Sequence, residues 1–273
     1  VNKYLNEVHM RIVKSFFKSR IFKNKLVFLF FITAHCSAIA QMSIEKAEEL
    51  WILQQDQIKI LYQEGDLDSA LIVVQKNLDI AENAFGSNSW QYVSSLMNLA
   101  QIQSELELLE NANKTYELAL GKSVSVFGEN ADETLDILDK YGEFLNSIDP
   151  EMASPVLKEV LRLTSSEDAK RPSRMRALGI NFQEMGQISE AELMFENSVK
   201  AYKKNLGEEN SETIFTTVKL AQLYLSQGKL KSARDLLENV KPLMKKVFDE
   251  KNYIVLESKE NLAEIYRLQG EFS

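Results

Sequence analysis

The side chains that most often carry out chemistry in proteins are confined to the beginning of this chain. Its two histidines are His9 and His35, and its one cysteine is Cys36. Imidazole and thiol groups are the usual zinc ligands, nucleophiles and general bases. Their absence from Gln41 onward excludes the usual zinc sites, disulfides, thiol nucleophiles and histidine-based triads from the body of the chain.

Carboxylate pairs are the remaining groups that could act together as acid and base. At helical spacing such pairs are typical of solvated faces, because a catalytic pair needs one buried member with a raised pKa. The ten glycines form no phosphate-binding cluster, and the sequence has no calcium loop of the Asp-x-Asn-x-Asp type. We therefore expect no enzyme activity, no cofactor and no metal site. The pairs are Glu48 with Glu49, Glu208 with Glu209, and Glu257 with Glu260.

Charge is distributed unevenly along the 273 residues. Seven of the 32 Lys and Arg, but only one of the 40 Asp and Glu, lie in residues 1–40. The 25 basic and 39 acidic residues that follow give residues 41–273 a net charge of −14. Because an acidic body repels phosphate backbones, we expect no nucleic-acid partner.

The first forty residues have the pattern of a secretory signal peptide. The basic stretch Lys18–Lys25 precedes the apolar run Leu26–Ala34, and a small-x-small end follows at Ala38-Ile39-Ala40. These features predict a signal peptide over residues 1–40, cleavage after Ala40, and export to the periplasm or the extracellular space. The apolar run is shorter than the roughly 20 residues that a helix needs to span a bilayer, so we expect no membrane association of the mature form.

Two alternatives for this segment stay open. The first is an uncleaved membrane anchor, since the apolar run could extend to Ala40. The second is a lipoprotein modified at Cys36, although His35 and Thr33 do not match the residues that usually precede such a cysteine. Met10 is an alternative start to Val1 and would leave a compact basic region before the apolar run.

A period of about 42 residues organises the rest of the chain. The segments Gly65–Ala70, Gly186–Ala191 and Gly228–Ala233 share a glycine followed five residues later by an alanine. We use the position of that glycine as the anchor of each repeat. The anchors are 42 residues apart, except for one interval of 37. They are Gly65, Glu107, Asp149, Gly186, Gly228 and Gly270.

Columns around the anchors predict a pair of helices in each repeat. Apolar residues recur at spacings of three and four on both sides of the anchor, which indicates helices. A glycine ends the first helix because it adopts a positive φ without cost. Small residues seven before and five after the anchor let the two helices approach closely. The earlier column holds Ile58, Ala100, Gly142, Gly179, Ala221 and Ala263, and the later one holds Ala70, Ala112, Ser154, Ala191 and Ala233.

The pattern resembles the tetratricopeptide repeat (TPR) family, specifically its kinesin-light-chain-like variety with 42-residue repeats. The residues that carry the resemblance are Asn98-Leu99-Ala100, the segment Asn261–Gly270, and the linker Leu206–Asn210. The resemblance implies an all-α fold, a right-handed α-solenoid of helix-turn-helix repeats. About five and a half repeats would occupy residues 41–273. Ser189 and Glu192 additionally predict a capping box at the start of a second helix.

Repeat 3 departs from this pattern. Its anchor is Asp149, it is five residues short, and it contains Pro150, Pro155 and Pro172. We expect residues 149–172 to form the weakest stacking joint and to alter the twist of the solenoid. The chain stops at Ser273, before the second helix of the sixth repeat, so we expect either a longer natural protein or association through the uncapped last helix.

The resemblance also implies a concave groove, lined by the first helices, that binds a peptide. The column ten before the anchor holds Gln55, Met97, Arg176, Val218 and Glu260, and the column six before holds Lys59, Gln101, Ile180, Gln222 and Glu264. Carboxamides suit this role because they both donate and accept hydrogen bonds. The set of Lys, Arg and Asn with which related proteins bind chaperone C-termini is not reproduced. The predicted groove residues are Asn98, Gln101, Lys219, Gln222 and Asn261.

These observations together predict a non-catalytic, exported scaffold that binds a protein or peptide of unspecified identity. One alternative is that the chain is the sensory or docking region of a longer signalling or enzymatic protein. The other is a catalytic protein in its own right, for which the sequence offers no reactive set of residues.

Overall fold

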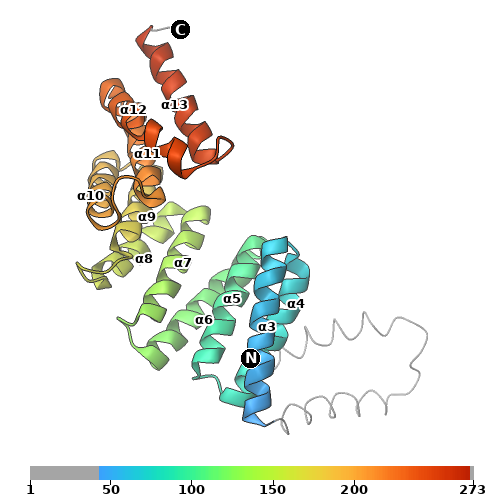
Figure 1. Cartoon of the computed structure of the whole chain (residues 1–273). Coiled ribbons are helices and arrows are strands. Elements are labelled where there is room, and N and C mark those ends of the chain that lie inside the picture. The colour runs from blue at the N-terminus through green and yellow to red at the C-terminus, as the bar shows by residue number, and fades with distance from the viewer. Residues whose placement is uncertain (1–42, 271–273) are drawn as a thin grey trace. The chain divides into compact units, whose positions relative to one another are not determined.

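The computed structural model describes residues 43–270, and in that range every regular element is a helix (Figure 1). The predicted signal peptide, with His9, His35 and Cys36, lies outside the described residues. The chain forms two compact units, with the boundary between Tyr92 and Val93, inside helix α5 (Trp90–Glu105). No helix within residues 43–270 combines the length and apolar character needed to cross a membrane.

The first unit is a helical hairpin built around a buried amide. Its elements are α3 (Ile44–Glu64), α4 (Leu67–Ile80), the π-helical turn η1 (Ala81–Phe85) and the start of α5. The side-chain amide of Asn77 donates to the Trp51 carbonyl at 2.9 Å and accepts from Gln55 at 2.8 Å, which ties α4 to α3. The buried Trp51 ring meets the exposed Trp90 edge to face, with centroids 5.0 Å apart.

The second unit continues the hairpin pattern, and from Leu109 onward each helix packs against its neighbours in sequence. The first helices α7, α9 and α11 pair with the second helices α8, α10 and α12. The predicted helical hairpins are therefore confirmed. The helices are α6 (Leu109–Phe127), α7 (Asp132–Ile148), α8 (Pro150–Leu163), α9 (Arg171–Glu184), α10 (Ile188–Leu206), α11 (Ser211–Ser226), α12 (Leu230–Val247) and α13 (Tyr253–Gln269).

The anchors lie where the first helix of each hairpin ends. All four anchor glycines have φ between 70° and 76°, a left-handed conformation in which a Cβ atom would be strained. Glu107 takes the same conformation, with φ of 56°, and is the one non-glycine residue within 43–270 with a positive φ. Asp149 instead is extended, and its carboxylate caps α8 by accepting from the Glu151 N–H at 2.9 Å.

The small residues predicted at the helix seams are buried where the helices meet. A Cβ atom built on Gly142 would lie 2.6 Å from Leu157, and one built on Gly179 would lie 3.2 Å from Phe195. The alanines of the later column are fully buried, and Ser154 is nearly so. Ala263 differs because it is exposed on α13. Close helix approach therefore explains why these columns hold mostly small side chains, with Ile58 as the exception.

One local expectation is contradicted by the structure. The capping box is wrong: α10 begins at Ile188 without a side-chain cap, and Glu192 instead accepts hydrogen bonds from Gln227 and Lys229. In repeat 3, Pro150 and Pro172 lie in the first turns of α8 and α9, where proline is well tolerated, and only Pro155 lies further inside a helix.

Candidate binding groove

The first helices of the second unit surround a cavity of about 710 Å³. This volume is within the range of pockets that enclose small ligands or a few side chains. Helices α5, α7, α9 and α11 supply almost all of its walls, and α8 adds one leucine. The lining residues are Met97, Asp136, Asp139, Lys140, Glu143, Asn146, Leu157, Lys170, Ser173, Arg174, Arg176, Ala177, Ile180 and Phe215.

Helical periodicity brings these side chains to one wall. Residues three and four apart on a helix share a face. On α7 the lining follows this spacing from Asp136 to Asn146, and on α9 it does so from Ser173 to Ile180. Helices α7 and α9 therefore each present one stripe of side chains to the cavity, and α5 and α11 contribute one side chain each.

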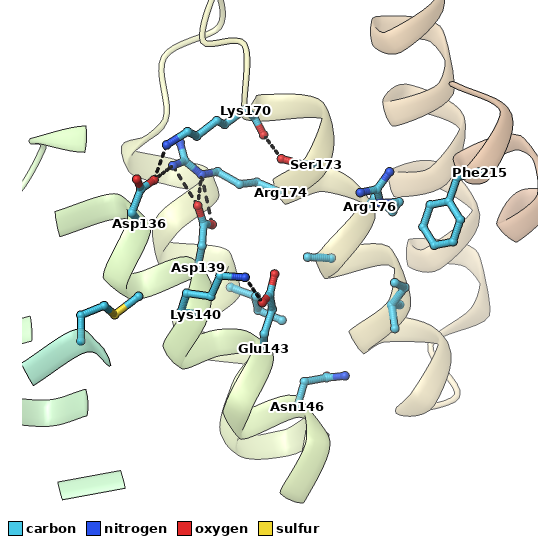
Figure 2. A pocket seen from close by; sticks show the side chains of 14 residues that line it. Asp136, Asp139, Lys140, Glu143, Asn146, Lys170, Ser173, Arg174, Arg176 and Phe215 are labelled. Atoms are coloured by element: carbon cyan, nitrogen blue, oxygen red, sulfur yellow. Dashed lines mark hydrogen bonds and ion pairs between the residues drawn. The ribbon is translucent and has the colours of Figure 1, made fainter. Parts of the chain in front are cut away.

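Arg174 is the centre of an ion network on one side of the cavity (Figure 2). Its Nε donates to both carboxylate oxygens of Asp139 at 3.1 and 3.0 Å, and its Nη1 donates to Asp168 at 3.0 Å. The Thr164 hydroxyl accepts from the same Nη1 at 2.9 Å. Burial raises the pKa of the Asp139 carboxyl, and the adjacent guanidinium opposes that rise. The network joins α7, α9 and the loop between α8 and α9.

Arg176 occupies the other side, next to Phe215 (Figure 2). Its Nη1 donates to Glu212 at 2.6 Å and to Thr216 at 3.0 Å. Its guanidinium lies over the Phe215 ring, 4.7 Å from the centroid, and 5.5 Å from that of Tyr202. Cation–π contacts of this kind hold an arginine in one orientation. Arg176 therefore braces α9 against α11.

Apolar and amide groups complete the lining. Met97, Leu157, Ala177 and Ile180 supply apolar surface to the lining. Asn146 accepts a hydrogen bond from Asn181 at 2.8 Å. Within residues 43–270 no group of three or more His, Cys, Asp and Glu could hold a metal ion. The cavity offers shape, charge and hydrogen bonding, which are the means of recognition.

None of the five groove residues predicted from the sequence lines this cavity. Asn98 and Gln101 are half-buried three residues apart on α5, and Lys219 and Gln222 have the same relation on α11. Lys219 contacts a lining residue, because its Nζ is 5.5 Å from the centroid of Phe215, and it also donates to Glu257 at 2.9 Å. Asn261 is half-buried on α13, and its amide nitrogen has no hydrogen-bond partner.

The repeat columns nevertheless locate much of the lining. Met97 and Arg176 are in the column ten before the anchor, and Ile180 is in the column six before it. Counted back from Asp149, the same columns contain further lining residues. The sequence prediction omitted them because it favoured amide side chains. A column thirteen before the anchor adds others. The residues reached from Asp149 are Asp139 and Glu143, and the additional column holds Asp136, Ser173 and Phe215.

Comparisons with known proteins agree with this architecture. Residues 173–246 match the tetratricopeptide repeat family model. BtubC (BKLC) of P. vanneervenii has 20% identity and a TM-score of 0.65, covering 77% of this chain and 89% of its own. A Podosopora anserina protein assigned as a kinesin light chain, with nearly identical TPR-like repeats, has 20% identity and a TM-score of 0.62, covering 71% and 94%. PilF of Pseudomonas aeruginosa has 18% identity and a TM-score of 0.55, covering 83% and 95%. A search of the curated proteins finds no match.

Proposed function

We propose that this chain, whose residues 173–246 match the tetratricopeptide repeat family model, is a non-catalytic scaffold that binds a peptide segment of another protein. The proposed site is the cavity between α5, α7, α9 and α11. TPR proteins are typically protein-binding scaffolds.

The observation that carries this proposal is the combination of an apolar floor with charged groups that are already ordered. Ala177 and Ile180 lie on α9, the helix that also carries Arg174 and Arg176. Side chains held by hydrogen bonds before binding lose little freedom when a ligand arrives, which favours affinity. The cavity is therefore suited to bind a segment rather than to react with it.

Export is a second part of the proposal. The basic stretch Lys18–Lys25 and the apolar run Leu26–Ala34 support a cleaved signal. Expression of the full chain in a secreting host, followed by mass spectrometry of the exported product, should give a mature N-terminus at Gln41. Retention of the full chain in the cytosol would overturn export without affecting the binding proposal. The docking region of a longer protein is the alternative, and it would use the same cavity.

Binding to the cavity is tested by filling it. A random library of short synthetic peptides is screened against the full chain, and the binders are measured by fluorescence anisotropy. Ala177→Leu extends a side chain into the cavity and should weaken specific binders at least about tenfold, or ~1.4 kcal/mol. The matched control is Asn197→Leu, which adds a leucine to an exposed position of α10 and should change nothing. Binders that tolerate Ala177→Leu as well as the control would contradict the site.

A further inference from the structure

The two arginines of the cavity are less exposed than the carboxylates that pair with them. The Arg174 side chain is 1% exposed, whereas Asp136, 3.8 Å from it, is 49% exposed. The Arg176 side chain is 16% exposed, and its partner Glu212 is 46% exposed. A ligand approaching either arginine therefore meets a carboxylate first.

The remaining cations are also engaged by carboxylates. Lys140 pairs with Glu143 at 2.7 Å, and Lys170 pairs with Asp136. An acidic ligand would have to displace one of these carboxylates before it could use a cation. That exchange replaces one ion pair by another while bringing like charges together, so it gives little net attraction.

The charge around Arg174 is acidic overall. Three carboxylates, those of Asp136, Asp139 and Asp168, surround only two cations, Lys170 and Arg174. The net charge of −14 on residues 41–273 adds a long-range field of the same sign. This field repels acidic segments and attracts basic ones.

Beside the charged groups, the cavity lining includes small and apolar residues that leave room for an apolar side chain. Ala177 contributes a single methyl group where neighbouring lining positions carry longer chains, and Ile180 is one turn further along α9. In Figure 2 the Asp136–Lys170–Arg174 group and the Arg176–Phe215 pair lie on opposite sides of the site. An apolar side chain placed between them would have charged groups on both sides of its backbone.

We infer that the occupant of this cavity is a basic segment in which one apolar side chain is flanked by Lys or Arg. The apolar side chain packs against Ala177 and Ile180, and the flanking cations pair with the exposed carboxylates of Asp136, Glu143 and Glu212. This inference rests on the proposed function and specifies the class of peptide that the site selects.

A biased peptide library tests the inference. Each member has a central apolar residue and flanking positions that are Lys, Gln or Glu, and the full chain is the bait. Enrichment of Lys at the flanks is the expected result. Enrichment of Glu, or no preference among the three, overturns the inference but leaves peptide binding in place. Absence of any binder that is sensitive to Ala177→Leu instead overturns the proposed function, so the two failures are distinguishable.

Charge variants sharpen the same measurement. Glu143→Gln removes an exposed carboxylate and should weaken a Lys-flanked binder about two- to fivefold, as expected for one exposed ion pair. Glu143→Lys should weaken it further, and a Gln-flanked peptide should respond much less to either change. The matched control is Asp235→Asn, which removes one negative charge from an exposed position of α12 that does not line the cavity. Equal weakening by Asp235→Asn and Glu143→Gln would show that only the overall charge acts, and would overturn the pairing.

Discussion

Two hairpin turns of the second unit lack the anchor glycine, and their backbone conformations differ from each other. At Glu107, between α5 and α6, the backbone keeps the glycine conformation, and the Leu108 N–H still bonds to the Gln103 carbonyl at 2.9 Å. At Asp149, between α7 and α8, the left-handed residue is gone and one extended residue separates the two helices. The turn at Glu107 keeps the left-handed backbone at the expense of strain. The turn at Asp149 instead has an extended backbone.

The connection between α8 and α9, which follows the hairpin with the turn at Asp149, is also different from the others. Helix α8 has 14 residues, whereas α6 and α10 each have 19. The loop after α8 is held by arginines: Arg171 donates to the Thr164 carbonyl at 2.7 Å, and Arg174 joins α7 to the loop. The shortened hairpin is therefore joined to the next one by buried polar contacts in addition to apolar packing.

The largest expected effect is at this polar joint. Arg174→Leu leaves Asp139 and Asp168 without their cation, so we expect the free energy of unfolding to fall by about 3–5 kcal/mol. Urea unfolding followed by circular dichroism measures the change. Lys170→Ala removes an exposed cation from the same network and should cost about 1 kcal/mol or less. A similar small loss for both variants would contradict a structural role for the buried arginine.

The turn at Asp149 should show a smaller loss. Asp149→Ala removes the side chain that accepts from the Glu151 N–H, so the free energy of unfolding should fall by about 1 kcal/mol. Asp149→Asn keeps an accepting oxygen and serves as the control in the same urea titration. If the asparagine variant loses as much as the alanine variant, capping is not the role of this residue.

The turn at Glu107 should respond with the opposite sign. Glu107→Gly removes the strain of a left-handed non-glycine residue, so we expect the free energy of unfolding to rise by about 0.5–1 kcal/mol. Asp149→Gly at the equivalent position should bring no gain, because that residue is extended. Thermal and urea unfolding of the two variants side by side would reveal the contrast. Stabilisation of both would mean that the two turns do not differ as described.

The smallest effect, absent at neutral pH, concerns the contact of α7 with α6. The Tyr141 hydroxyl donates to Asn113 at 2.9 Å, and burial together with Glu117 raises the pKa of Tyr141 to about 12. An unfolded tyrosine ionises near pH 10, so the stability linked to this group is complete below that pH and is lost as the pH rises toward 12. Tyr141→Phe should flatten the fall in unfolding free energy over this interval. An unchanged slope in pH-dependent urea titrations would exclude the contribution.

The fold could be predicted from the sequence because its determinants are local and repeated. Gly186 and Gly228 are at the predicted helix ends, and Gly142 and Gly179 occupy seams where a Cβ atom would crowd the facing helix. The different turn at Asp149 was indicated only by the missing glycine and the shorter repeat. Its extended backbone and its cap depend on the residues that follow, which the period does not describe.

The candidate site could be predicted only in part. The columns that named Met97, Arg176 and Ile180 point into the cavity, because periodic position determines which face of a helix a residue occupies. The Arg174 network was missed because it joins residues 35 positions apart and depends on the irregular loop after α8. An arginine in a sequence gives no sign of whether its charge is exposed or enclosed by carboxylates.

Because Arg174 is buried, its ion pairs should respond to ionic strength differently from the exposed carboxylates around the cavity. Salt screens exposed charges over a Debye length of about 3 Å at 1 M, whereas buried pairs are screened much less. The joint that holds α7 to α9 should therefore persist in concentrated salt, while the exposed carboxylates around the cavity lose most of their attraction for a basic segment. A saline environment could release such a ligand and leave its binding surface intact.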